Sequence, residues 1–194
     1  MRPRASWATL SLVKRAHVLG LFGLVLTACS ATPPANWAKG GAILDLPRAR
    51  WVRGDVIVDI VPDGQILVNG EPYFTLDRGG RIADLDGEPV ALLEADGRVS
   101  GADDTPLGMV GWMNSALPEQ TTAWLSIQPS GQVVRYDDEG EAVVYGVWMG
   151  CNASPRTHQA CTYVTHVLAQ KLRTEEPRSG VSFGIGIGVG VPLR

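Results

Sequence analysis

Between residues 51 and 150, hydrophobic residues occur in short runs separated by turn-forming residues at regular intervals. Four units begin with Gly, a polar residue and Ile or Val, and they are spaced by 16, 17 and 34 residues, the last being twice 17. Their first residues are Gly64, Gly80, Gly97 and Gly131. Each glycine allows a tight turn between two β-compatible runs. The pattern predicts a module of about five antiparallel β-hairpins over residues 51–150.

A different pattern follows in residues 151–176. Ser154 and Pro155 are suited to the cap and first position of a helix, and no further Gly or Pro occurs before Pro177. Apolar residues recur at helical spacing. They are Ala160, Val164, Val167, Leu168 and Leu172. We therefore expect one helix, placed with this single apolar face over an open side of the β module.

The last segment, residues 177–194, contains a strict alternation of apolar residues with Gly or Ser from Val181 to Val191. A period of two predicts a strand, either as a sheet member or as a contact site for a partner. The predicted fold class is thus mainly β, with repeated antiparallel β-hairpins of 16–17 residues, one C-terminal α-helix and a Gly-alternating terminal strand.

Residues 1–28 are typical of a secretory signal peptide. They contain four basic residues and no acidic one, and residues 18–27 form an uninterrupted apolar run. Ten residues of helix are too short to span a bilayer. The sequence Leu26-Thr27-Ala28-Cys29 follows, and it resembles the lipobox of bacterial lipoproteins.

The lipobox resemblance implies cleavage before Cys29, a thioether-linked diacylglyceryl group on its sulfur, and acylation of the new amino terminus. Ser30 in place of Asp implies sorting to the outer membrane of a Gram-negative bacterium, with the domain in the periplasm or at the cell surface. The alternative is an ordinary signal peptide whose cleavage site lies near a cysteine. On the first interpretation, the lipid at Cys29 is the attachment to the membrane.

Composition and charge indicate a packed domain and disfavour nucleic-acid binding. With 45% hydrophobic and 19% charged residues, the chain is expected to form a packed domain. Without residues 1–28, which carry four of the 17 basic residues, the formal charge falls from −3 to −7. An acidic protein without a Lys/Arg-rich patch is not expected to bind nucleic acid. Residues 29–50, rich in Ala, Pro and Gly, are predicted to be a lipidated tether.

The cysteines suggest a structural bond rather than a metal site. If Cys29 is lipidated, Cys151 and Cys161 remain, and in an oxidising compartment we expect a disulfide worth about 2–3 kcal/mol. A zinc site that adds His158 and His166 is disfavoured, because eight residues of helix separate the two histidines. We predict no metal and no cofactor, with histidines that are solvated or cap the helix.

No catalytic motif occurs, so the sequence assigns no catalytic residue. Acidic clusters at residues 84–88 and 137–141 fall at repeat turns, where Asp and Gly serve turn geometry. Units such as residues 80–90 resemble the short hairpin repeats of bacterial envelope proteins, including four-fold β-flower and YD-type repeats, and imply an all-β repeat module.

The leading functional hypothesis is a structural or protein-interaction role at the cell envelope, with an envelope protein as partner. Exposed hairpin edges, tryptophans and the terminal strand are the expected contacts. The alternative is an envelope-polymer hydrolase or a small-ligand-binding lipoprotein. A deep pocket that gathers titratable groups from different hairpins would favour the alternative, and a filled core would favour the first hypothesis.

Overall fold

The computed structural model describes residues 31–137 and 139–175, with side chains up to residue 171, and this part of the chain is mainly β with one α-helix. The predicted signal peptide, Cys29 and the predicted terminal strand lie outside the described residues. The strands are β1 Ala49–Arg53, β2 Val56–Ile60, β3 Gln65–Val68, β4 Glu71–Leu76, β5 Arg81–Ala83, β6 Pro89–Leu93, β7 Arg98–Gly101, β8 Pro106–Val110, β9 Asn114–Ala116, β10 Leu125–Ile127, β11 Gln132–Tyr136 and β12 Ala142–Met149. A short 3-10 helix, η1 Ala102–Asp104, follows β7, and the α-helix is α1 Pro155–Glu175.

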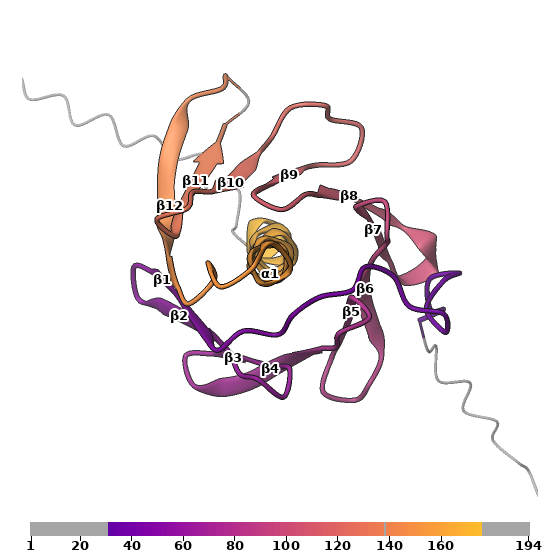
Figure 1. Ribbon diagram of the computed structural model, residues 1–194. Helices are drawn as coiled ribbons and strands as arrows, with labels where there is room; N and C mark the ends of the chain where they lie inside the picture. Colours follow the sequence, from indigo (N-terminus) through magenta and orange to yellow (C-terminus); the bar gives the residue numbers. More distant parts are fainter. Residues whose placement is uncertain (1–30, 138, 176–194) are drawn as a thin grey trace, which may run out of the picture.

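The twelve strands form a closed antiparallel barrel (Figure 1). Each strand pairs with its neighbours in sequence, and β1 closes the ring by pairing with β12, where Trp51 lies opposite Trp148. Closure gives every strand of the barrel two partners, so no row of backbone donors and acceptors is left unpaired. The expectation that exposed hairpin edges would form contacts is therefore wrong for these strands.

The four repeat glycines share one set of backbone contacts. All have positive φ, between 76° and 93°. The carbonyl oxygen of each accepts a hydrogen bond of 2.7–2.9 Å from an amide at or near the end of a later strand. The pairs are Gly64 with Leu76, Gly80 with Leu93, Gly97 with Val110, and Gly131 with Trp148. A Cβ on any of them would lie 2.0–3.0 Å from the carbonyl oxygen of the same partner. Each repeat glycine therefore marks a point where two backbone segments approach closely.

Helix α1 passes through the middle of the barrel (Figure 1). Its bounds agree with the predicted helix, but its place does not. From Thr157 to Ala169 every side chain is buried except that of Gln159, which is partly buried. The helix is thus enclosed on all sides, whereas one apolar face over an open sheet was expected. A barrel of twelve strands is too wide for its own inward side chains to fill, and the helix occupies the remaining space.

Residues 41–48, which the composition assigned to the tether, are part of the folded body. They cross the end of the barrel where α1 begins (Figure 1). The amides of Ala42 and Leu44 donate to the carbonyls of Leu93 and Arg78 at 2.7 and 3.0 Å, and Leu44 is only 1% exposed. This segment closes one end of the barrel over the core.

Candidate functional site

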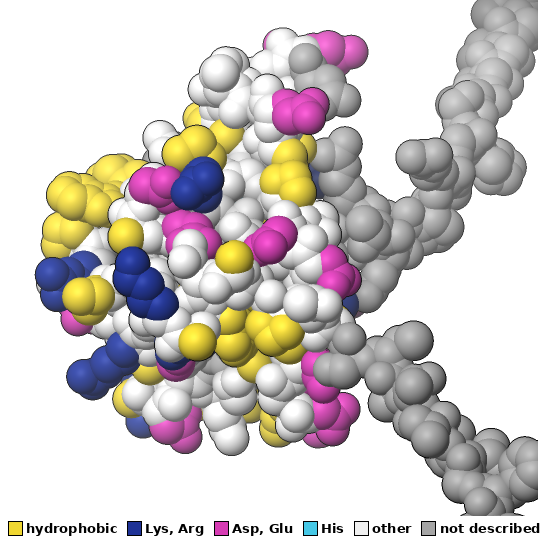
Figure 2. Space-filling model, turned by 90° about the vertical axis from the view of Figure 1, so that its right-hand side faces the viewer, with side chains coloured by type: hydrophobic (Ala, Val, Ile, Leu, Met, Phe, Trp, Pro, Cys, Tyr) yellow, Lys and Arg dark blue, Asp and Glu magenta, His cyan; other side chains and the backbone are white. Residues whose placement is uncertain are grey.

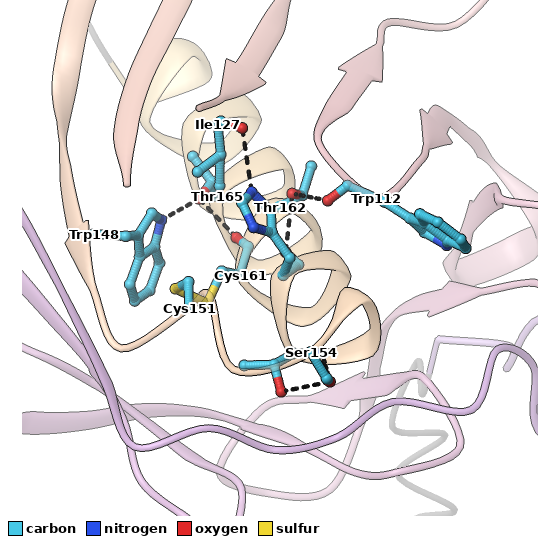
Figure 3. The surroundings of a disulfide bond; sticks show 10 residues. Trp112, Ile127, Trp148, Cys151, Ser154, Cys161, Thr162 and Thr165 are labelled. Carbon is cyan, nitrogen blue, oxygen red and sulfur yellow. Dashed lines mark hydrogen bonds between the residues drawn. A yellow bond between two sulfur atoms is a disulfide. The ribbon is translucent and has the colours of Figure 1, made fainter. Parts of the chain in front are cut away.

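Tryptophans of the barrel wall bind polar side chains of the helix. The indole nitrogen of Trp148 on β12 donates to the hydroxyl of Thr165 at 2.8 Å (Figure 3). The indole nitrogen of Trp124, just before β10, donates to Nδ1 of His166 at 3.0 Å. Because an indole N–H can only donate, both helix groups are fixed as acceptors in these pairs. The polar positions of α1 therefore hold the helix to the wall rather than facing solvent.

His166 is a neutral histidine in the barrel interior. Its Nδ1 accepts from Trp124, so Nε2 carries the proton and donates to the carbonyl of Leu107 at 2.8 Å. Burial lowers the pKa of His166 to about 4, and the hydrogen bond to Leu107 opposes this shift. His158 is also buried, with Nε2 at 3.1 Å from the carbonyl oxygen of Ile127. The expectation that the two histidines would be solvated or capping is wrong.

The disulfide predicted between Cys151 and Cys161 is present and ties the start of α1 to the segment before it (Figure 3). The hydroxyl of Ser154 accepts from the amide of Thr157 at 3.1 Å, which is the predicted helix cap. It also donates to the carboxylate of Asp45 at 2.9 Å, which links the cap to the segment that closes the barrel end. These three contacts thus fix the first two turns of the helix.

The four residues considered for zinc are not brought together. Cys151 and Cys161 are used in the disulfide, and His158 and His166 bind carbonyls of different strands. Within the described residues, no group of three or more His, Cys, Asp or Glu side chains is placed to hold a metal ion.

Acidic side chains at the repeat turns bind their own backbone, as expected. Oδ1 of Asp84 accepts from the amides of Asp86 and Glu88 at 3.0 and 2.9 Å. Asp137 accepts in the same way from Glu139 and Glu141. These carboxylates therefore stabilise tight turns.

An apolar depression of about 330 Å³ surrounds the first turn of α1, and we call it the helix-start depression. Trp112 is 63% exposed and Met113 is 40% exposed. The hydroxyl of Thr162 donates to the carbonyl of Trp112 at 2.9 Å, so the exposed loop is fixed to the enclosed helix. The depression is lined by Trp112, Met113, Pro129, Asn152, Ala153, Ser154, Pro155 and His158. The disulfide and the cap hold one side of it, so its shape is preformed.

Two further depressions are lined by strands of the barrel wall. One, of about 530 Å³, runs over β1, β2, β3 and β12, and its charged groups include the ion pair of Arg50 with Asp59 at 2.7 Å. The other, of about 470 Å³, lies over β8 and β9 and is lined by Asp96, Asn114 and Gln120 among others. Figure 2 shows one face of the molecule, on which exposed hydrophobic side chains form separate patches between acidic and basic ones.

The sequence did not single out Trp112, Trp124 or His166 as a group. A signal was present in part, since Thr162, Thr165 and His166 lie off the predicted apolar face of the helix. Polar residues off the apolar face of a helix are usually solvent-exposed. Here their hydrogen-bond partners lie on distant hairpins, so the sequence of the helix does not indicate that they are buried.

Comparison of the chain with protein-family models, with curated proteins and with solved structures gave no match. In the part of the chain that the structure describes, no helix is both long enough and apolar enough to cross a bilayer.

Proposed function

We propose that this chain is a lipid-anchored protein of the bacterial cell envelope, with a structural or protein-interaction role. The observation that carries the anchor is the position of Cys29, directly after Leu26-Thr27-Ala28 and a basic leader with an apolar run. The disulfide of Cys151 and Cys161 supports a compartment outside the cytoplasm, because such bonds persist where the environment is oxidising.

The filled interior supports an interaction role for the outer surface. Barrels that hold a small ligand keep it in the lumen, and here α1 occupies that space. Among the exposed surfaces, the helix-start depression combines an aromatic ring with a flexible thioether, in Trp112 and Met113. Tryptophan and methionine are enriched in the centres of protein interfaces. We assign partner binding to this depression.

The anchor is tested with the full-length protein in cells supplied with labelled palmitate. The wild type should incorporate label and fractionate with membranes, and Cys29→Ala should do neither. The double variant Cys151→Ala with Cys161→Ala is the matched control and should keep the label. Mass spectrometry that finds an unmodified amino terminus downstream of Cys29 would refute the proposal.

The binding surface is tested with a photo-crosslinking amino acid placed at position 113. We expect one discrete adduct whose yield falls about tenfold in Trp112→Ala, which corresponds to about 1.4 kcal/mol of binding free energy. Leu85, which is 63% exposed on another hairpin, is the control position and should give no such adduct. Equal adducts from positions 113 and 85, or a yield unaffected by Trp112→Ala, would contradict the assignment.

A further inference from the structure

The first residues that the structure describes are already bonded to the barrel. The amide of Thr32 donates to Oδ1 of Asp103 at 3.2 Å, and the amide of Asp103 donates back to the carbonyl of Thr32 at 2.8 Å. The amide of Ala35 donates to Oδ1 of Asp104 at 2.8 Å. Both aspartates belong to η1, which follows β7. We call this set of bonds the amino-terminal clamp.

A second set of bonds holds the residues that follow. The guanidinium of Arg81 on β5 donates to the carbonyls of Trp37 and Ala38 at 2.6 and 3.1 Å. The amide side chain of Asn36 donates to the carboxylate of Glu94 at 3.1 Å. Residues 31–40 are therefore attached to three parts of the wall: β5, the end of β6 and η1. This segment cannot act as a free linker while these bonds persist.

Very little chain separates this segment from the proposed lipid. Cys29 is two residues before Ala31, so their Cα atoms are at most about 7 Å apart. The polar headgroup layer of one leaflet is about 5–8 Å thick. With the acyl chains of Cys29 in the hydrocarbon, Ala31 and the wall beside it lie at the headgroups.

We infer that residues 31–40 and η1 form the face that the protein presents to the lipid surface, so that the barrel rests on the bilayer in one orientation. This inference rests on the lipid anchor proposed above. The carboxylates of Asp103 and Asp104 point to contact with headgroups and not to insertion, because charged side chains are costly in the hydrocarbon. In Figure 1 residues 31–40 lie outside β6 and β7, on the opposite side of the ring from β1 and β12.

This orientation leaves defined surfaces free for a partner. The wall of β1 and β12 points away from the bilayer, and with it the exposed Val52 and Val147, which lie opposite each other in the sheet. The helix-start depression lies at an end of the barrel, beside the lipid surface and not under it. A partner could therefore reach this depression while the protein is anchored.

The orientation is tested with the acylated, otherwise unmodified mature protein in phosphatidylcholine nanodiscs that contain a small fraction of gadolinium-chelate lipid. Amide signals of residues 32–40 and 102–105 should be attenuated more than those of residues 143–149. Twelve strands about 4.8 Å apart make a barrel roughly 20 Å across, and paramagnetic relaxation falls steeply with distance, so the ratio should exceed about tenfold.

Two variants separate the orientation from the anchor. An insertion of about 15 Gly and Ser residues between Ser30 and Ala31 keeps the lipid but frees the barrel, and should reduce the ratio to near one. Asp103→Ala with Asp104→Ala removes both carboxylate bonds of the clamp but keeps the backbone bond between residues 103 and 32, and should give an intermediate ratio. If the amide signals of both regions were attenuated equally in the acylated wild type, or those of residues 143–149 more strongly, the orientation alone would be overturned. An unacylated Cys29 in cells would instead overturn the anchor.

Discussion

The two ring nitrogens of His166 have different partners, and this difference fixes its protonation state. Trp124 can only donate, so Nδ1 is an acceptor and the single ring proton is on Nε2. Nε2 lies 2.8 Å from the carbonyl oxygen of Leu107 and 2.6 Å from the side-chain nitrogen of Gln170. A second ring proton would face the indole N–H directly and would be buried without an acceptor. Burial favours the neutral form and lowers the pKa of His166 to about 4, although the hydrogen bond to Leu107 opposes this shift.

We expect the protein to lose stability as the pH falls from about 6.5 towards 4. The pKa of His166 is about 4 in the folded protein and about 6.5 in an unfolded chain, so in this range the unfolded chain binds the additional proton. The loss from this group should be about 2 kcal/mol of unfolding free energy between pH 7 and pH 5. Denaturant unfolding at both pH values measures it.

The control for this prediction is His166→Gln, which keeps an acceptor for Trp124 but does not titrate. Its unfolding free energy should be lower than that of the wild type at pH 7, and the difference should shrink at pH 5. A difference that stays constant between the two pH values would show that His166 does not contribute to the pH dependence.

Among the secondary-structure elements, the hairpins depend on glycine for two separate reasons. Gly64 and Gly70 both have positive φ, at 93° and 87°. A Cβ on Gly64 would lie 2.1 Å from the carbonyl oxygen of Leu76, whereas nothing lies within 4 Å of a Cβ on Gly70. The two positions flank β3, so they separate backbone conformation from close packing in one hairpin.

Gly70→Ala should lower the unfolding free energy by about 1 kcal/mol, the cost of a left-handed conformation for a residue with a Cβ. Gly64→Ala should cost about 3 kcal/mol or more, because it must also displace the strand that bonds to it. Thermal or denaturant unfolding of the two variants gives the comparison. Equal losses would mean that only the turn conformation matters at the repeat glycines.

For helix α1, the local sequence predicts the bounds but not the environment. Ser154 and Pro155 mark its start, and the absence of Gly and Pro predicts its length. The apolar spacing indicated one buried face, yet Thr165 and His166 on other faces are at most 1% exposed. Their acceptor atoms match indole donors on β12 and before β10, and no pattern within the helix records those partners.

For the whole molecule, enclosure of the helix couples its stability to that of the barrel. Amides of α1 between residues 160 and 168 have no route to solvent unless strands of the wall separate. Native-state hydrogen exchange should therefore give these amides opening free energies equal to the global unfolding free energy. Helix amides that exchange more easily than those of the wall strands would show that the helix leaves an intact barrel.

The two candidate contact surfaces also depend on the fold of the whole molecule. The helix-start depression is formed by the β8–β9 loop, Pro129 and the first turn of α1. The amino-terminal clamp joins residues separated by about 70 positions in the sequence. Trp112 is one of several tryptophans in the sequence, and only its exposed position in the folded chain distinguishes it from the buried Trp51 and Trp148. Neither surface could have been located from spacing or composition.

Features that arise between near neighbours along the chain followed from the amino-acid sequence alone. These are the hairpin turns at the repeat glycines, the bounds of α1 and the pairing of Cys151 with Cys161. Turn conformation, capping and helical period depend on a few consecutive residues. With Cys29 assigned to the lipid, the two remaining cysteines leave a single pairing. The fold confirmed these predictions for the described residues.

Three other features became known only from the folded chain: β1 pairs with β12, the helix lies inside the ring, and residues 41–48 close its end. Trp51 and Trp148 are nearly 100 residues apart, and their pairing depends on the twist and width accumulated over all the hairpins. That closure creates the interior, and the interior then determines which polar residues of the helix are buried. No local pattern contains this information, because burial is a property of the completed barrel.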